Sequence, residues 1–282
     1  MRISISATTH PGHERDNNED AFILCPDLTH PQWTTDTATL RQPLSPLGAL
    51  ILVADGIGGF NAGEVASAIA AQSVADTFTP ESVNQAIATP EASTSLLRQA
   101  IANAHEAINQ HIINDFHTVG MGTTIVLAWV QPQHTHIAWC GDSRCYLYTP
   151  STGLKPLTHD HSYVQQLIDQ GDITPEEALT HPDNNIITRA LGDVDCSTEP
   201  EVTTLPTQVG NTLILCTDGL SGYITDPTIL RTVEATHRNP AQCRDALLQL
   251  ALDAGGHDNI AIAVAQLDTH HPNLLQKLFK RH

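Results

Sequence analysis

Short apolar runs and longer stretches with helical spacing alternate along the chain. Alternation at residues 3–7 and an apolar run at 21–24 predict two strands near the start. Runs rich in β-forming residues at 123–129 and 136–139 flank the turn Gln131-Pro132-Gln133, and this arrangement predicts a hairpin.

Helical spacing is clearest between about residues 92 and 115. There, apolar side chains recur at Leu97, Ile101, Ala104, Ile108 and Ile112. An earlier helix is expected to start at Asn61, which can cap it together with Glu64 three residues later. The apolar face expected for that helix consists of Val65, Ile69 and Ser73. The proline-bearing stretch 26–46 is expected to be a surface excursion.

The last part of the chain has the pattern strand, helix, helix, strand. Its segments are residues 213–216, 229–233, 243–252 and 260–264. Hairpins combined with paired helices favour an α+β layered sandwich over alternating βαβ units.

Four aspartates lie at the ends of apolar runs, namely Asp55, Asp142, Asp218 and Asp258. Each run is typical of a strand buried on both faces, so each carboxylate is expected where a core strand reaches the surface. Gly56 and Gly219 follow two of them directly, and glycine permits positive φ or a close backbone approach. The pattern predicts one acidic metal centre built from four distant stretches.

Composition narrows the classes of function. Hydrophobic residues make up 40% of the 282 residues and charged residues 16%, which is typical of a globular protein. The formal net charge of -18 and an aromatic content of 4% disfavour nucleic-acid binding. Metals, basic partners and small substrates remain as candidate ligands. Most of the carboxylates are expected to form a solvated acidic surface.

The six cysteines form no CxxC pair, so neither a zinc site nor a disulfide framework is predicted. Residues 1–5 do not begin a signal peptide, and no run of 18 apolar residues suggests a membrane helix. We therefore expect a cytoplasmic protein with reduced cysteines and no integral membrane segment.

A series of motifs makes the chain resemble a known family. In order, it carries Gly12-His13-Glu14-Arg15-Asp16-Asn17-Asn18-Glu19-Asp20, Asp55-Gly56-Ile57-Gly58-Gly59, Met121-Gly122-Thr123-Thr124, Gly141-Asp142-Ser143-Arg144, Asp218-Gly219-Leu220 and Asp258-Asn259. From about Gly12 to Leu267 it resembles the metal-dependent protein phosphatases, the type 2C serine/threonine phosphatases, and particularly their bacterial members. The resemblance implies a four-layer α/β/β/α sandwich with two packed antiparallel sheets flanked by helix pairs.

The resemblance also implies roles for the acidic residues. Asp55 would bridge two divalent cations, with Asp218 and Asp258 completing the site of one. Glu19 and the Gly56 carbonyl would serve the other cation. Asp20 would support these ligands, and Asp142 with Asp218 would hold a third, weaker cation. Oxygen-rich coordination favours Mn²⁺ or Mg²⁺ over zinc. Gly222 stands where many relatives carry an aspartate, which puts the third site in doubt.

Catalysis in such a centre would use water activated between two cations, with no phosphoenzyme. The predicted catalytic residues are Arg15, Asp55 and Asp218. Arg15 suits bidentate binding of the substrate phosphate, and the alternative role for it is to neutralise Glu19 and Asp20. Several eukaryotic relatives carry a histidine in the Asp-Gly loop that serves as the general acid. In this chain the loop has Ile57 and Phe60 instead. His161 is a candidate substitute, or else a solvated bystander.

The expected organisation is a single catalytic domain over residues 1–268, with a flap at about 159–192, followed by a basic tail at 269–282. The tail is either a short amphipathic helix that touches a membrane or partner, or a frayed end. Expected partners are phosphoprotein substrates and a cognate serine/threonine kinase, with no nucleic acid, and the protein is expected to be a monomer.

Two rival interpretations exist. Gly141-Asp142-Ser143 could belong to a lipase-like hydrolase with Ser143 as nucleophile, but its position in mid-chain disfavours this. The chain could also be a non-catalytic, metal-stabilised phosphoprotein-binding or sensor module of the same fold. The presence of the whole acidic set together with Arg15 disfavours that alternative.

Overall fold

The computed structural model describes residues 1–58, 62–178, 180–192 and 197–269. Predictions that concern Gly59, Phe60, Asn61 and the tail beyond Thr269 therefore lie outside the described residues.

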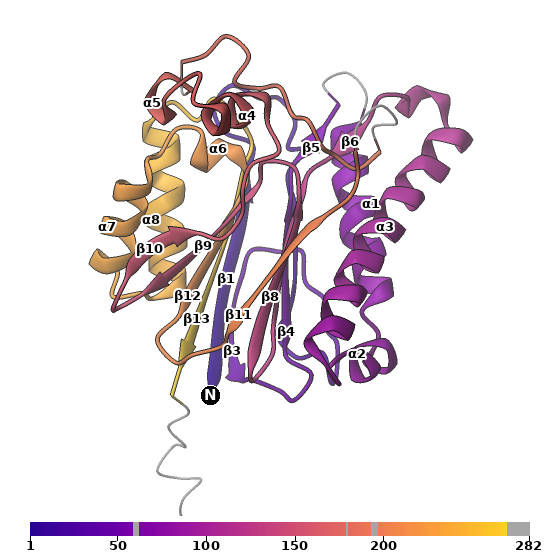
Figure 1. Cartoon of the computed structure of the whole chain (residues 1–282), viewed down its shortest axis with the longest axis vertical. Coiled ribbons are helices and arrows are strands. Elements are labelled where there is room, and N and C mark those ends of the chain that lie inside the picture. Colours follow the sequence, from indigo (N-terminus) through magenta and orange to yellow (C-terminus); the bar gives the residue numbers. More distant parts are fainter. Residues whose placement is uncertain (59–61, 179, 193–196, 270–282) are drawn as a thin grey trace, which may run out of the picture.

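Two antiparallel sheets face each other at the centre of the molecule (Figure 1). The β1 sheet has the order β10 (Gly153–Pro156), β9 (Arg144–Thr149), β12 (Thr212–Cys216), β13 (Ile260–Asp268), β1 (Arg2–His10) and β3 (Ala38–Pro43). The β4 sheet has the order β11 (Glu201–Pro206), β8 (His134–Cys140), β7 (Ile125–Val130), β4 (Ala49–Ala54) and β2 (Ala21–Cys25). A small ribbon pairs β5 (Gly56–Ile57) with β6 (Gly122–Thr123).

Helices cover the outer face of each sheet (Figure 1). The β4 sheet is covered by α1 (Gly63–Thr77), α2 (Pro80–Ala86) and α3 (Pro90–Asn114), and a 3-10 helix follows at Phe116–Thr118. The β1 sheet is covered by α6 (Asp218–Ser221), α7 (Asp226–Ala235) and α8 (Pro240–Asp253). Two further helices, α4 (Tyr163–Gln170) and α5 (Pro175–Ala178), lie above one end of the sheets. None of the described helices is long and apolar enough to cross a bilayer.

The buried apolar runs are explained by this layering. In β4, Leu50 and Leu52 pack toward the helices, whereas Ile51 and Val53 pack toward the other sheet. Because alternate side chains of a strand point to opposite faces, a strand with a core on both sides must be apolar at every position. The predicted α/β/β/α sandwich is therefore present.

The helix predicted over 92–115 is confirmed as α3, in which Leu97, Ile101 and Ala104 are fully buried. The prediction for α1 is confirmed only in part. This helix begins at Gly63 after Ala62, whose φ is 69°, and the predicted cap Asn61 lies outside the described residues. Ala66, Ala70 and Val74 are its buried positions, and the predicted Val65 and Ile69 are partly buried and pack against the same core.

The stretch 26–46 is not only a surface excursion, because β3 pairs antiparallel with β1 within it. Residues of β3 alternate between half-buried and exposed, as expected of an edge strand. The hairpin predicted around residues 131–133 is confirmed by the pairing of β7 with β8.

Candidate metal centre

The topology brings the strand-end aspartates to one end of the sandwich. Strands β4 and β8 both pair antiparallel with β7, so both strands finish at the same end of the sheet. Asp55 and Asp142, which follow these strands, are therefore placed at that end. Strand β12 pairs antiparallel with β13, so the end of β12 lies beside the start of β13. Asp218 follows β12 and Asp258 precedes β13, and both therefore lie at one end of this sheet. The loops involved meet at the end of the sheets near β5 and α6 (Figure 1).

The glycines next to Asp55 and Asp218 are needed for close packing and not for positive φ. A Cβ atom on Gly219 would lie 1.9 Å from the Asn259 carbonyl oxygen, and one on Gly56 would lie 2.3 Å from the Gly63 carbonyl oxygen. Neither Gly56 nor Gly219 is among the residues with positive φ. Any side chain at either position would push the loops of the site apart.

Threonine and asparagine side chains hold the acidic segments in place. The Thr217 hydroxyl donates to Asp20 Oδ2 at 2.7 Å, and the Thr123 hydroxyl donates to the Asp55 carbonyl at 2.8 Å. Asn259 Oδ1 accepts from the Glu19 N–H at 2.7 Å and so joins β13 to the segment before β2. Sequence reasoning missed these supporting roles.

One signal for them was present, because Thr217 and Asn259 directly adjoin Asp218 and Asp258. Thr124 lies in the run 123–129 for which a strand is predicted. It is fully buried, and its hydroxyl also accepts from the Asp55 N–H at 3.2 Å.

Burial and crowding raise the carboxyl pKa values at this end of the sheets. Burial is the first cause for Asp20, Asp55, Asp142 and Asp218. Negative neighbours raise the pKa further, since Asp20, Asp218 and Asp142 act on Asp55, and Asp258 acts on Asp218. The contact between the Asp55 and Asp218 side chains acts in opposite directions, since it raises the pKa of Asp55 and lowers that of Asp218. Burial and then Glu64 raise the pKa of Glu19.

These residues fit a hard divalent cation. Asp20 Oδ1 and Asp142 Oδ1 are buried and have no hydrogen-bond partner among the described residues. The donors are oxygens, which Mg²⁺ and Mn²⁺ prefer. No group of three or more His, Cys, Asp or Glu side chains in the described part of the chain is already arranged to hold a metal.

Arg15 lies at the rim of this acidic cluster. Its Nη2 is 2.8 Å from Asp258 Oδ2, and its side chain is 53% exposed. Its direct partner is thus Asp258, whereas Glu19 acts on it only through charge. About half of the Arg15 side-chain surface is therefore exposed to solvent and accessible to a ligand.

His161 is neither a solvated bystander nor a free acid. It is 5% exposed, and its Nδ1 accepts from the Gly141 N–H at 3.1 Å. Its Nε2 lies 3.2 Å from Glu201 Oε1 and 3.2 Å from Arg189 Nη1. Burial, then Arg189, lowers the pKa of the imidazole. The ring thus joins the start of the segment 159–192 to the loop that carries Asp142.

Ser143 is 1% exposed, and its hydroxyl shares a 2.7 Å hydrogen bond with Thr124. A buried hydroxyl cannot reach a substrate ester, which excludes the lipase-like interpretation.

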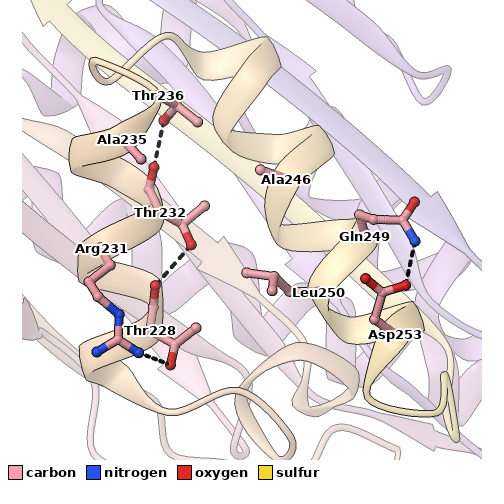
Figure 2. Close-up of a pocket in the computed structure, with 9 residues that line it drawn as sticks. All are labelled: Thr228, Arg231, Thr232, Ala235, Thr236, Ala246, Gln249, Leu250 and Asp253. Carbon is pink, nitrogen blue, oxygen red and sulfur yellow. Dashed lines mark hydrogen bonds between the residues drawn. The ribbon is translucent and has the colours of Figure 1, made fainter.

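A surface groove of about 460 Å³ lies between α7 and α8 (Figure 2). It is lined by Thr228, Arg231, Thr232, Ala235, Thr236, Ala246, Gln249, Leu250 and Asp253. None of the predicted site residues is among them.

A buried carboxylate cluster with an exposed arginine at its rim defines a metal-dependent phosphohydrolase class of site. The family model of protein phosphatase 2C matches residues 39–253. The serine/threonine phosphatase stp of Listeria welshimeri is 33% identical over 257 residues, which cover 88% of this chain and 98% of that protein. The chain belongs to the protein phosphatase 2C family.

Solved structures of serine/threonine phosphatases are also similar to this chain. The serine/threonine phosphatase PstP/Ppp of Mycobacterium tuberculosis has a TM-score of 0.77 at 30% identity, over 95% of this chain and 100% of that one. The catalytic domain of PstP in complex with two manganese ions has a TM-score of 0.74 at 29% identity, over 95% of this chain and 100% of that one. The predicted family, fold class and phosphatase class are confirmed.

Proposed function

We propose that this chain hydrolyses phosphoserine and phosphothreonine in proteins at a binuclear Mn²⁺ or Mg²⁺ centre. The observation that carries the proposal is the set of buried carboxylates with raised pKa values and unpartnered oxygens beside the half-exposed Arg15. The relatives named as serine/threonine phosphatases and the manganese-bound PstP structure support it.

The ligand roles follow from the family resemblance. By that resemblance, Asp55 would contribute to both cation sites, with Asp218 and Asp258 holding one cation and Glu19 and the Gly56 carbonyl the other. Asp20 acts as a support, consistent with its hydrogen bond from Thr217. A third, weaker site rests on Asp142 and Asp218 alone, since Gly222 offers no carboxylate.

Divalent cations in such a centre supply an activated water and offset the charge of the phosphate. The chain's own contribution begins with Arg15, whose planar fork binds two phosphate oxygens while Asp258 orients it. The leaving alkoxide must gain a proton. His161 is unsuited to donate it because both ring nitrogens are engaged within the protein, so the proton comes from solvent.

We further propose a monomeric, cytoplasmic enzyme that opposes a cognate serine/threonine kinase, with residues 1–268 as one catalytic domain and 159–192 as its flap. Cys25, Cys145, Cys216 and Cys243 are buried and form no disulfide within the described part of the chain, which supports a reducing compartment.

The direct test is phosphate release from para-nitrophenyl phosphate and from a phosphothreonine peptide with Mn²⁺ or Mg²⁺. We expect Asp55→Asn and Asp218→Asn each to lower kcat by on the order of a hundredfold or more, since each removes a ligand charge. Asp76→Asn, at an exposed position of α1, is the matched control and should leave kcat unchanged. If the wild-type protein turns over neither substrate with any divalent cation, the non-catalytic binding or sensor module becomes the better explanation.

A further inference from the structure

Three exposed side chains form a shelf beside the acidic cluster. Tyr223 is 44% exposed, and its ring centroid lies 5.3 Å from that of His257 at an angle of 39°. His257 Nδ1 lies 2.6 Å from Glu14 Oε1. Side chains of Glu14 and His257 are 58% and 43% exposed. We call these three residues the Tyr223 shelf.

The shelf borders the place where the phosphate is expected to bind. Glu14 precedes Arg15, His257 precedes Asp258, and Tyr223 lies just after the short helix that begins at Asp218. Burial raises the pKa of the Tyr223 hydroxyl, Asp218 and Asp258 raise it further, and Arg15 lowers it. The phenol therefore lies within electrostatic reach of the residues proposed to bind metal and phosphate.

The backbone holds the shelf in position. Gly255 and Gly256 have φ values of 125° and 56°, which favour glycine. A Cβ on Gly255 would lie 2.2 Å from His257 Nε2, so the imidazole packs directly over that turn. The His13 N–H donates to the Gly256 carbonyl at 2.6 Å and joins the turn to the segment of Glu14 and Arg15. The ring of His257 is thus fixed from two sides.

We propose that the Tyr223 shelf recognises an arginine or lysine side chain near the phosphorylated residue of the protein substrate. A flat, exposed aromatic ring attracts a cation over its face. The Glu14 carboxylate accepts one hydrogen bond from His257 and has lone pairs left for a guanidinium or ammonium group. An acidic side chain would instead meet Glu14 and the carboxylate cluster beyond it.

Tyr223 and Glu14 are therefore specificity-determining residues. This inference rests on the proposed function, because it concerns substrates of the same site. Successive residues of an extended peptide are about 3.3 Å apart along the chain, so a cation within three residues of the phosphate can reach the shelf.

The test uses neutral phosphothreonine peptides in which arginine or glutamate is placed in turn at each of three positions on either side. We expect the wild-type protein to prefer arginine over glutamate, at one position at least, by about three- to tenfold in kcat/KM, mainly through KM. Tyr223→Ala and Glu14→Gln should each reduce that ratio toward one, whereas Tyr223→Phe should retain it. Phe116→Ala, which removes another exposed aromatic ring, should leave the ratio unchanged.

Turnover of para-nitrophenyl phosphate by the same samples separates this inference from the proposed function. A wild-type protein that hydrolyses it and the neutral peptide but shows no preference for arginine refutes the shelf and leaves the phosphatase in place. A preference that persists in both Tyr223→Ala and Glu14→Gln also refutes it. Folding defects would lower all rates together and would not change the arginine-to-glutamate ratio.

Discussion

His136 shows how one buried side chain can make the stability of the fold depend on pH. It is fully buried in β8, its Nδ1 shares a 2.8 Å hydrogen bond with Thr204, and its Nε2 has no partner in the described part of the chain. Burial, then His134, lowers the pKa of His136 to about 4. The imidazole is therefore neutral in the folded protein at pH 7.

Because the unfolded chain takes up this proton first, folding stability is lost as the pH falls from about 6.5 to about 4. We expect the wild-type protein to lose about 2–3 kcal/mol of unfolding free energy over this window through His136. His136→Gln should start less stable at pH 7 but lack this component. Urea unfolding at pH 7, 5 and 4 measures it, with the exposed His117→Gln as control. Parallel losses in wild type and His136→Gln would contradict the assignment.

For single residues, the sequence predicts the acidic candidates for metal binding better than it predicts the side chains that hydrogen-bond to them. Asp55 and Asp218 are visible because each ends an apolar run. The hydrogen bond from Thr217 to Asp20 joins residues 197 positions apart, and that between Asn259 and Glu19 joins residues 240 apart. Such pairs depend on sheet topology, which no local pattern specifies.

Among the elements, the segment 159–192 is pinned at both ends and carries α4 and α5 between them. The Thr188 N–H donates to the His161 carbonyl at 2.7 Å, and the Thr123 N–H donates to the Leu191 carbonyl at 3.0 Å. At its base, Arg144 Nε donates to Asp160 Oδ1 at 2.9 Å. The segment is thus anchored to β9 and β6, next to the loop of Asp142.

We expect His161→Ala to loosen this segment without changing the shape of the pH–rate profile, because the ring positions the segment and does not transfer a proton. Hydrogen exchange should become faster for residues 159–192, and kcat should fall. His159→Ala is the matched control, since this neighbouring side chain is 53% exposed and pairs with Asp169 at the surface. Loss of one limb of the pH–rate profile in His161→Ala would show that His161 is an acid after all.

Prediction of the elements succeeded where a repeating pattern faces a core. Helix α3 has such a pattern, as do the strands of the inner layers. It missed β3, and for α1 it identified partly buried positions and missed the fully buried alanines. An edge strand such as β3 needs little apolar surface. The buried face of α1 consists largely of alanines, and alanine alone does not show which side of a helix is buried.

For the whole molecule, the main electrostatic feature is a set of buried acids in a chain of net charge -18. Without cations, the raised pKa values of Asp20, Asp55, Asp142 and Asp218 mean that the folded state binds more protons than the unfolded state. Their contribution to stability is present at low pH and is lost as the pH rises above the ordinary carboxyl pKa of 3.8.

We therefore expect Mn²⁺ to raise the Tm of chelator-treated protein at pH 7 by about 5–10 °C at 100 times its Kd, and by progressively less toward pH 4. Asp55→Asn should reduce this gain and should make the metal-free protein more stable than wild type at pH 7. Differential scanning fluorimetry at several pH values measures both effects, and Asp76→Asn should behave like wild type. An equal Mn²⁺ shift in Asp55→Asn would rule out Asp55 as a ligand.

The pairing of β1 with β13 has a practical consequence. Arg2 lies opposite Asp268, so the chain enters and leaves the sandwich side by side, at the end away from the acidic cluster (Figure 1). A bead, an affinity tag or a fused protein attached near Arg2 or Asp268 would therefore lie at the end of the sandwich opposite the acidic cluster. The fold can thus be immobilised or tethered to a second protein without obstructing the approach of a large phosphorylated target.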